Sequence, residues 1–418
     1  MTLTTPGLDN RGTVSGRQVR LQAGQLGNSG TLSADETLTV QAQSGLDNSG
    51  SLLSGGALTI AAGQTDNRGV LSGGAVTVTG DALSNGGTLQ GRQSVSLNTV
   101  GPLSQTADGA LTSGGTVTLS SGTLETAGAL SAQGLQLRTG LWRNQGAVSL
   151  TGDGQLTLDE LDNGGTLLSS GTWDIAGGRL GNSGTLQGSG LTLRGERLDN
   201  QGVLTGTTQT ALRLGGALAN RGTVSGNRLA VTAATLDNGG TLLGVEALTL
   251  TADGALTNRG RLLTQGAAVL TAASVDNDGE GQAGSLQLTA DRLRNGGQIQ
   301  SDGACTVSLS PSGQLVNSGT LAANGETGLS LGGLDNRGTL SVRGDLTVTG
   351  ADLRNAGQMA AQGALTLTGN YGGAGSLYSE GALSLSGAAL VNDGGRWQGE
   401  TLAVHGGPAR PTAARSPG

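Results

Sequence analysis

The sequence is poor in several residue types on which enzymes and nucleic-acid-binding proteins depend. Its 418 residues include no Phe, no Lys, 1 His and 1 Cys, and aromatic residues make up 1%. The Arg residues are spread thinly against a net charge of −7, so the chain lacks the basic stripe that a nucleic-acid reader needs. Because a compact core draws much of its buried area from aromatic side chains, this composition also argues against an ordinary globular domain.

Long apolar segments are missing as well. No run approaches the roughly 20 apolar residues that span a bilayer. Residues 1–7 lack a charged region followed by an apolar one, so we expect no signal peptide in these residues. Cys305 can form no disulfide within the chain, which suits an exported protein as well as a cytosolic one. Because a repeated phrase is already under way at Leu8, we expect the sequence to be a segment of a longer protein.

The chain is rich in Gly, with 80 residues, and in a phrase that contains it. One copy, residues 236–242, reads Leu-Asp-Asn-Gly-Gly-Thr-Leu, and we number each copy from its Asn, the index residue. The index residues are Asn10, Asn28, Asn48, Asn67, Asn85, Asn144, Asn163, Asn182, Asn200, Asn220, Asn238, Asn258, Asn277, Asn295, Asn317, Asn336, Asn355 and Asn392. Gln105, Thr126 and Gly373 take the index position in three further copies. About 21 copies with a period of about 19 residues indicate a solenoid.

Strand patterns follow each index residue. Apolar residues alternate with small polar ones, as in Leu248, Thr249 and Leu250, and this period of two indicates half-buried strands. Each copy offers three short extended pieces, around index plus four, around plus ten to twelve, and just before the next index residue. The sequence therefore predicts an all-β fold, a parallel β-helix or solenoid, over residues 1–405, with apolar residues at minus two, plus four, plus ten and plus twelve in its core. Residues 406–418 hold half of the Pro residues and are expected to be a disordered tail.

We expect the Asn and Gly of each phrase to form a corner between two strands, since both tolerate the left-handed backbone region. Stacked Asn side chains can also pass amide hydrogen bonds from coil to coil. Departures from the phrase at residues 105–130 and 277–288, where Gly281 replaces a Leu, predict a looped-out or loosened turn at each place.

Charged residues gather at index minus one. Asp recurs there in alternate coils through the middle of the chain, and Arg294 and Arg354 take the same column near Asp276 and Asp335. This spacing limits repulsion between carboxylates. The alternative interpretation of the column is a calcium or ligand row.

Few residues are candidates for chemistry. His405, beside the expected tail, is better explained as a solvated residue than as a catalytic one, and Cys305 stands in the plus-ten column, where a small buried hydrophobe is expected. Tyr378 is expected to be exposed, whereas the other aromatic residues fall in core columns, namely Trp142, Trp173, Tyr371 and Trp397. We therefore predict no catalytic, cofactor-binding or metal-binding residues and no cofactor. The index Asn residues are expected to act as a structural turn ladder.

Three other classes share features with this chain. Parallel β-helices include polysaccharide lyases and hydrolases, which gather carboxylates in a groove built by long loops and bind sugars on aromatic rings, so a polysaccharide-active enzyme is the alternative function. Calcium-binding nonapeptide repeats share the composition but not the period. The Thr column at plus three is similar to the arrays of ice-binding β-helices, but Arg261, Glu280 and Gln298 interrupt it, so strand propensity explains it better.

The phrase Leu-Asp-Asn-Arg-Gly-Thr-Leu at residues 334–340, followed by Gly344 and a strand at 346–348, resembles the repeat of filamentous haemagglutinin-type exoproteins, and the resemblance covers roughly residues 3–405. It implies a right-handed β-helical shaft, secreted by the two-partner route through an outer-membrane barrel transporter. Such shafts serve as adhesins or as stalks of contact-dependent growth-inhibition toxins. The expected function is therefore a non-enzymatic structural shaft at the bacterial cell surface. Host or neighbouring-cell receptors or glycans would be bound by segments outside this chain.

Overall fold

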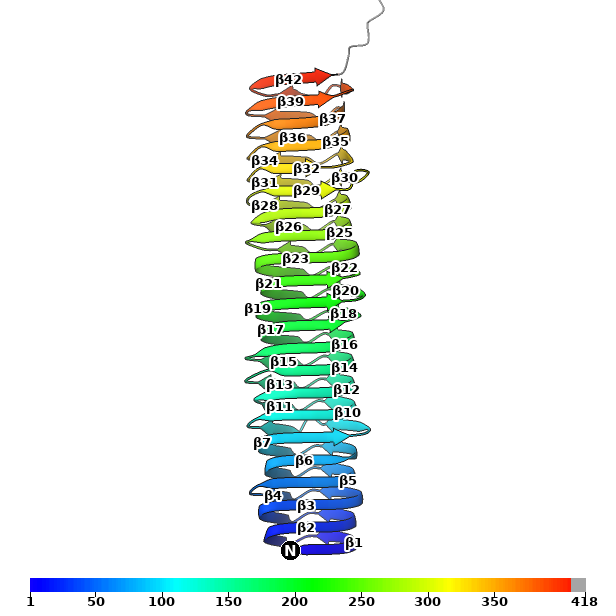
Figure 1. Cartoon of the computed structure of the whole chain (residues 1–418), viewed down its shortest axis with the longest axis vertical. Coiled ribbons are helices and arrows are strands. Elements are labelled where there is room, and N and C mark those ends of the chain that lie inside the picture. Colours follow the sequence, from blue (N-terminus) through cyan, green and yellow to red (C-terminus); the bar gives the residue numbers. More distant parts are fainter. Residues whose placement is uncertain (407–418) are drawn as a thin grey trace, which may run out of the picture. The chain divides into compact units, whose positions relative to one another are not determined.

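The computed structural model describes residues 1–406, in which β-strand is the only regular secondary structure. Parallel strands form a β-solenoid of about 21 turns with a period of roughly 19 residues, as the sequence predicts. The chain divides into two compact units, residues 1–216 with 221–226, and residues 217–220 with 227 onward. Within each unit, the strands are stacked coil upon coil (Figure 1). No helix in residues 1–406 is long and apolar enough to cross a membrane.

The strands of the first unit are β1 (Thr2–Asn10), β2 (Thr13–Asn28), β3 (Thr31–Asn48), β4 (Ser51–Ser54), β5 (Ala57–Asn67), β6 (Val70–Asn85), β7 (Thr88–Thr99), β8 (Pro102–Gln105), β9 (Ala110–Ser113), β10 (Thr116–Thr126), β11 (Ala129–Ala132), β12 (Gly134–Asn144), β13 (Ala147–Leu150), β14 (Gly154–Asn163), β15 (Thr166–Ser169), β16 (Thr172–Asn182), β17 (Thr185–Gly195), β18 (Arg197–Asn200), β19 (Val203–Leu214) and the beginning of β21 (Thr223–Ala233). The second unit holds the rest of β21 and β20 (Ala217–Asn220), β22 (Thr235–Asn238), β23 (Thr241–Asn258), β24 (Arg261–Leu263), β25 (Ala267–Asn277), β26 (Glu280–Ala283), β27 (Ser285–Asn295), β28 (Gln298–Ser301), β29 (Cys305–Leu309), β30 (Gln314–Asn317), β31 (Thr320–Ala323), β32 (Thr327–Ser330), β33 (Gly333–Asn336), β34 (Thr339–Val342), β35 (Leu346–Asn355), β36 (Gln358–Ala361), β37 (Leu365–Gly373), β38 (Ser376–Ser379), β39 (Ala382–Gly387), β40 (Leu390–Asn392), β41 (Trp397–Gln398) and β42 (Thr401–Gly406).

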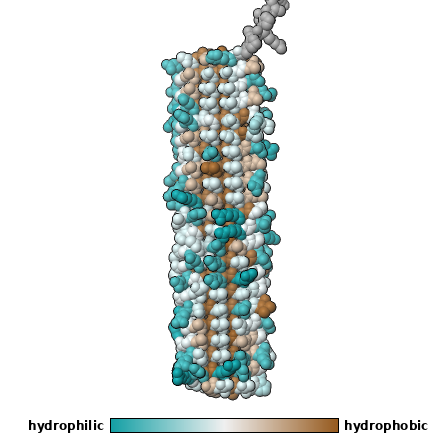
Figure 2. Space-filling model, viewed as in Figure 1, coloured by the Kyte–Doolittle hydropathy of each residue, from teal (hydrophilic) through white to brown (hydrophobic). Residues whose placement is uncertain are grey.

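Strand pairing places each residue beside its equivalent in the next coil. Between β1 and β2, for example, Leu8 pairs with Leu26 and Asn10 pairs with Asn28. Repeats differ in length, and the extra residues lie at corners, as after Gly16 of β2. The strands on either side of the corner therefore stay in register with the adjacent coil. Each column of the sequence therefore becomes a column in space, and Figure 2 shows columns of similar hydropathy on the visible face.

The core occupies the predicted columns at minus two, plus four, plus ten and plus twelve. In one coil of the second unit, the residues at these positions are all buried, namely Leu236, Leu242, Leu248 and Leu250. Trp142, Trp173 and Tyr371 are buried in the same columns, and Trp397 pairs with Leu377 in the plus-four column. Full burial of a Leu side chain contributes about 1.5–3 kcal/mol to stability. The stability of the core is therefore the sum of a small contribution from every coil.

The prediction of three separate extended pieces in every coil is wrong for part of the chain. In the first unit, β3 runs as one strand around a whole coil, whereas β28, β29 and β30 are separate in a coil of the second unit. A strand can continue around a corner because the corner residues keep pairing with the adjacent coil, as Gly16 does with Ala34.

The prediction of left-handed backbone at the index corners is wrong for all but two of them, those with Gly373 and Gly394. In residues 1–406, no residue other than Gly has a positive φ, and only Gly369, Gly373 and Gly394 are Gly residues with one. The requirement for Gly is steric instead. A Cβ atom at Gly30 would lie 2.1 Å from the carbonyl oxygen of Gly12, one coil away. Gly at index plus two is therefore needed because two coils approach each other closely there.

Two copies with an insertion in the turn, after Gln105 and after Asn392, obey the same steric rule. After Gln105, where index plus two is Ala107, a Cβ atom at Gly109 would lie 2.3 Å from the carbonyl oxygen of Asn85. After Asn392, it is Gly395 that approaches the preceding coil, with 2.2 Å to the carbonyl oxygen of Gly375. An insertion in the turn thus moves the required Gly along the sequence but keeps it in the same place in the coil.

The turn predicted to be looped out after Gln105 is confirmed. Gly109 donates a backbone hydrogen bond to Thr106 at 2.9 Å, and pairing resumes at Ala110, which lies beside Thr88. The prediction of a loosened turn after Asn277 is wrong, because Asp278 and Gly279 donate normally to the carbonyl of Asn258, at 2.8 and 3.0 Å.

A second looped turn escaped the sequence analysis. Gly313 donates to Ser310 at 2.8 Å between β29 and β30, and the adjacent index residues Asn295 and Asn317 are 22 residues apart. That long interval, together with Pro311, is the signal that could have revealed it.

Gly281 leaves a cavity in the core rather than a loose turn. It pairs with Leu262 in one neighbouring coil and with Ile299 in the other. A cavity of about 30 Å³, lined mainly by apolar side chains that include Leu270 and Leu288, lies where its missing side chain would be. A Cβ atom at Gly281 would come no closer than 3.8 Å to any neighbour, so the column has room for a larger residue.

Replacing Gly281 with Leu is expected to raise the free energy of unfolding of the second unit by about 1–2 kcal/mol, because it buries apolar surface in an existing void and removes the entropy of Gly from the unfolded chain. The midpoint of urea unfolding measures the change. Ser341→Leu, at an exposed position of the same unit, is the control and should leave the midpoint nearly unchanged. Equal effects of the two variants would contradict the assignment of the cavity.

The described residues end within a strand of the solenoid. His405 and Gly406 belong to β42, which pairs with β39, and His405 is exposed. Of the disordered tail expected at residues 406–418, all but Gly406 lies outside the described residues.

Candidate functional site

The index Asn residues form lines of side-chain hydrogen bonds inside each unit. Among the predicted set, 17 are buried, and Asn392 in the last described coil is exposed. In the first unit, each Nδ2 group donates to Oδ1 of the next index Asn at 2.7–2.8 Å, in the pairs Asn10 to Asn28, Asn28 to Asn48, Asn48 to Asn67, Asn67 to Asn85, Asn144 to Asn163, Asn163 to Asn182 and Asn182 to Asn200.

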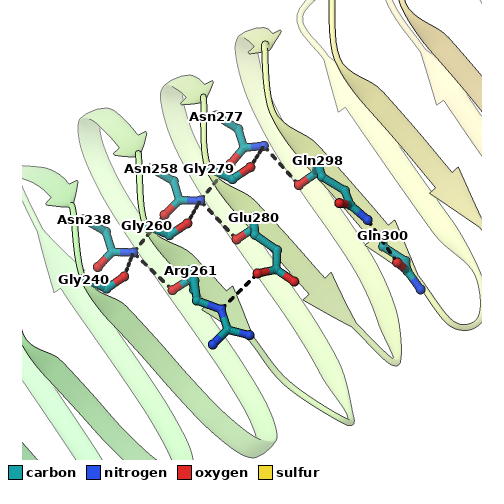
Figure 3. A network of polar contacts seen from close by, with 10 residues as sticks. All are labelled: Asn238, Gly240, Asn258, Gly260, Arg261, Asn277, Gly279, Glu280, Gln298 and Gln300. Atoms are coloured by element: carbon teal, nitrogen blue, oxygen red, sulfur yellow. Dashed lines mark hydrogen bonds and ion pairs between the residues drawn. The ribbon is translucent and has the colours of Figure 1, made fainter.

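The second unit has its own line of amides. The donor and acceptor are 2.8 Å apart in each pair, namely Asn220 to Asn238, Asn238 to Asn258, Asn258 to Asn277, Asn277 to Asn295, Asn295 to Asn317, Asn317 to Asn336 and Asn336 to Asn355. Figure 3 shows Asn238, Asn258 and Asn277 one above another in successive coils. Every bond runs in the same direction, from the coil that comes earlier in the chain to the one that follows.

Each ladder amide is held from several sides. Nδ2 of Asn258 also donates to the carbonyl of Gly260 in its own corner, at 3.3 Å, and to that of Glu280 in the next coil, at 3.2 Å (Figure 3). The backbone carbonyl of Asn258 accepts from the N–H groups of Asp278 and Gly279. A buried polar group is costly when it is unpaired and favourable when its network is complete. The index position therefore favours a side chain that both donates and accepts.

Other residues complete the line where Asn is missing. Thr126 donates its hydroxyl to Oδ1 of Asn144 at 2.7 Å and accepts a hydrogen bond from the indole of Trp142 at 3.0 Å. The side chain of Gln105 donates to the carbonyls of Gly109 and Ala129, at 2.9 and 2.6 Å.

Gly373 has no side chain, and the Tyr371 hydroxyl lies in its place, accepting from Nδ2 of Asn355 at 3.4 Å. Burial raises the pKa of Tyr371, and its hydrogen bond with Asn355 partly offsets that rise. The sequence analysis identified these index residues but not how they bond.

Ion pairs lie on the surface beside the ladder. The Asp residues at index minus one pair mainly with Arg residues at index plus one, a relation that the sequence analysis missed. Arg337 is 2.7 Å from Asp335 in the same corner, and Arg259 is 3.0 Å from Asp237 in the preceding coil. These pairs are exposed, and such pairs contribute little to stability individually.

Arg294 is the case that the sequence analysis did foresee. It contacts Asp276 at 2.6 Å and Asp278 at 2.7 Å, and the hydrogen bonds that it donates to both raise the pKa of its guanidinium group. In the column at index minus one, opposite charges are therefore in contact where Arg294 lies beside Asp276, and like charges are kept apart where Asp recurs in alternate coils. Residues 1–406 contain no group of three or more His, Cys, Asp or Glu side chains arranged to hold a metal ion.

Cys305 lies in β29 with its side chain in the core, as predicted. Burial raises the pKa of its thiol to about 12, and only the thiolate is a good nucleophile. We expect Cys305 to resist a thiol reagent in the folded protein at about pH 8 and to react promptly in denaturant. Titration with a chromogenic disulfide in buffer and in urea measures both rates. Rapid modification of the folded chain would show that β29 opens readily.

The exposed aromatic side chains do not form a platform for sugars within the described residues. Tyr378 is 38% exposed, whereas Trp142 and Trp173 are fully buried. Trp397 packs edge to face on Tyr371, with 5.4 Å between ring centroids. The aromatic residues thus pack mainly inside the coils.

The fold and the ladder define a class of protein, the parallel β-solenoids built from one repeated coil. Comparison of the sequence with known families gives matches to the haemagglutinin repeat at residues 14–90, 71–159, 206–260, 224–319, 281–371 and 360–399. The chain belongs to the haemagglutinin repeat family, which confirms the resemblance seen in its phrase. No solved structure matches it.

Its curated relatives are much longer proteins. The chain is 58% identical to the deoxyribonuclease CdiA of Dickeya dadantii (strain 3937), over 76% of this chain and 11% of the relative. It is 28% identical to the tRNA nuclease CdiA of Yersinia mollaretii, over 54% of this chain and 6% of the relative. It is 31% identical to the tRNA nuclease CdiA of Escherichia coli O6:K15:H31, over 51% of this chain and 6% of the relative. The chain thus spans about a tenth or less of the length of these relatives.

Proposed function

We propose that this chain is a non-enzymatic structural shaft of a large secreted bacterial surface exoprotein. The observation that carries the proposal is the buried ladder, in which nearly every index side chain bonds to the adjacent coil. The polar side chains that recur most regularly are therefore used to hold coils together. Membership of the haemagglutinin repeat family supports the same role.

The route of assembly follows from the local nature of the contacts. Each coil pairs with its two neighbours in the chain, so an unfolded chain that emerges at the cell surface can fold coil upon coil, each turn acting as the template for the next. The outer-membrane transporter of two-partner secretion is the partner that this route requires. Folding outside the cell would help to prevent the chain from sliding back.

The shaft would present a distal receptor-binding or toxin segment, or mediate adhesion. The names of the relatives, deoxyribonuclease CdiA and tRNA nuclease CdiA, favour toxin presentation in contact-dependent growth inhibition over adhesion. Contact with a host or neighbouring-cell receptor or glycan would then belong to other segments of such a protein.

Solution scattering tests the shaft. A globular protein of 418 residues would have a radius of gyration of about 22 Å, and we expect the purified chain to give a clearly larger value with the profile of an elongated particle. A compact particle would contradict the proposal. Truncation at an index corner, which removes whole coils, should shorten the particle in proportion.

A β-helical polysaccharide lyase or hydrolase is the competing function. A screen of the chain against polysaccharides, with detection of reducing ends and of unsaturated products, decides between the two. The shaft predicts no turnover of any glycan, and product formation that is proportional to protein concentration would overturn it.

A further inference from the structure

Four ladder Asn residues are followed directly by Gly, a pair that is chemically vulnerable. These pairs begin at Asn85, Asn163, Asn238 and Asn295. Gly has no side chain to hinder its backbone nitrogen, and an Asn side chain lies within reach of the neighbouring backbone groups. In a flexible chain, the Gly nitrogen can therefore attack the Cγ atom of the preceding Asn.

The reaction is a deamidation that needs only water and base. The Gly N–H loses its proton to hydroxide, the nitrogen forms a bond with Cγ, and the bond between Cγ and Nδ2 breaks. The amide nitrogen takes up a proton from water and leaves as ammonia. Water then opens the five-membered succinimide at either carbonyl and gives aspartate or isoaspartate. Water is consumed and ammonia released, with no change in oxidation state.

In the folded chain both reacting groups are held apart. Asn163 is fully buried, and its Nδ2 group donates to Oδ1 of Asn182 at 2.7 Å. Its Oδ1 atom accepts from Nδ2 of Asn144, also at 2.7 Å. The N–H of Gly164 donates to the carbonyl of the same Asn144 at 2.8 Å. The side chain is thus held by hydrogen bonds to both neighbouring coils, and the attacking nitrogen is held by a hydrogen bond to the preceding one.

The other three pairs are held in the same way. The N–H groups of Gly86, Gly239 and Gly296 donate to the carbonyls of the index Asn one coil earlier, each at 2.8 Å. Nδ2 of Asn238 donates to Asn258 and that of Asn295 to Asn317, each at 2.8 Å. Asn85, beside the looped turn, donates more weakly to the carbonyl of Ala110, at 3.4 Å. Coil stacking therefore protects all four pairs.

We propose that these four Asn-Gly pairs are deamidation sites of the unfolded chain and that folding protects them from the reaction. A coil that has been deamidated cannot form the ladder hydrogen bonds with its neighbours. An aspartate at position 163 would place a carboxylate oxygen against Oδ1 of Asn182, so that two acceptors face each other. Isoaspartate would in addition lengthen the backbone at the corner. On the proposed route of secretion, the chain is unfolded before it folds at the cell surface. The longer the chain stays unfolded, the smaller the fraction of molecules that can still fold would then be.

The test compares the purified full chain in urea and in native buffer at the same mildly alkaline pH. Peptide mass spectrometry follows the mass increase that results when an amide nitrogen is replaced by oxygen. In urea, the four ladder pairs should react at rates similar to Asn324, the Asn-Gly pair that lies off the ladder. In the folded chain, they should react roughly a hundredfold or more slowly, because reaction needs the coil to open. Equal rates in the two states would overturn the proposal.

Gly239→Ser provides the matched control. A Cβ atom at Gly239 would lie no closer than 3.8 Å to any neighbour, and Ser occupies the same position after Asn28 and Asn48. The variant should slow deamidation of Asn238 in urea while Asn163 and Asn295 of the same molecules react as before. Unchanged reaction at Asn238 would show that the Gly nitrogen is not the attacking group.

A second variant tests the consequence separately from the chemistry. Asn238→Asp introduces the product residue directly, and hydrogen exchange of the amides in strands β22 and β23 should become faster than in the unaltered chain. Unchanged exchange in those strands would show that the ladder accepts a deamidated coil, which would overturn that part of the proposal.

Discussion

Replacing Gly260 with Ala is expected to lower the free energy of unfolding of the second unit by about 3 kcal/mol or more, the range reached when a substitution forces a clash with backbone atoms. The new Cβ atom would lie 2.0 Å from the carbonyl oxygen of Gly240. Relief requires the two coils to separate, which breaks the hydrogen bonds that Gly260 and Arg261 donate to Asn238 and Gly240, at 3.0 and 2.8 Å. Urea unfolding monitored by circular dichroism measures the loss.

The matched control for this substitution is Gly328→Ala in the same unit. A Cβ atom at Gly328 would have no neighbour within 4 Å, so this variant should be neutral or slightly stabilising, because it only reduces the freedom of the unfolded chain. Similar losses for both variants would mean that Gly260 is needed for backbone conformation rather than for the close approach of coils.

Asn258→Asp is expected to cost about 3–5 kcal/mol at neutral pH, the usual effect of an uncompensated buried charge. Asn258 is fully buried, and its Nδ2 group faces three acceptors, Oδ1 of Asn277 and two backbone carbonyls. A carboxylate in the same place would face those acceptors with no hydrogen to donate. The unfolding midpoint of the variant, compared with that of the unaltered chain, measures the cost.

The cost of Asn258→Asp should depend on pH with a definite sign. Burial among acceptors favours the protonated carboxyl, so its pKa in the folded chain would be higher than the value of about 3.9 in the unfolded chain. The folded state then binds more protons than the unfolded state, and stability falls as pH rises above the unfolded pKa. Asn324→Asp, at an exposed position of the same unit, should show little cost at any pH. A pH-independent loss in the ladder variant would show that shape, and not charge, is the cause.

Much of the fold could be read from the sequence because a solenoid repeats one local pattern. The columns that contain Leu236, Leu242 and Leu248 were predicted as core and are buried. Cys305, Trp142 and Trp173 were assigned to the same columns and also lie there. In-register stacking makes this possible, since a residue of one coil lies beside the residue of the same column in the next.

Two of the errors concern contacts between neighbouring coils. The corner Gly was attributed to left-handed backbone, but its reason is a carbonyl oxygen of the preceding coil, as at Gly30. The replacement of Leu by Gly281 was interpreted as a loosened turn, but it leaves a void between Leu262 and Ile299. Neither feature is visible in one copy of the phrase, because the atoms that cause it belong to coils about 19 residues away.

The sequence by itself determined the repeat, its strands, its core columns and its family, because each of these depends on the order of residue types within one coil or on their recurrence. Tertiary structure alone decided which amide donates to which, where the Arg partners of the Asp column lie, and why the corner admits only Gly. Those outcomes depend on the separation of stacked coils and on the direction of side chains such as Asn238 and Asn258. These quantities exist only once one coil has folded against another.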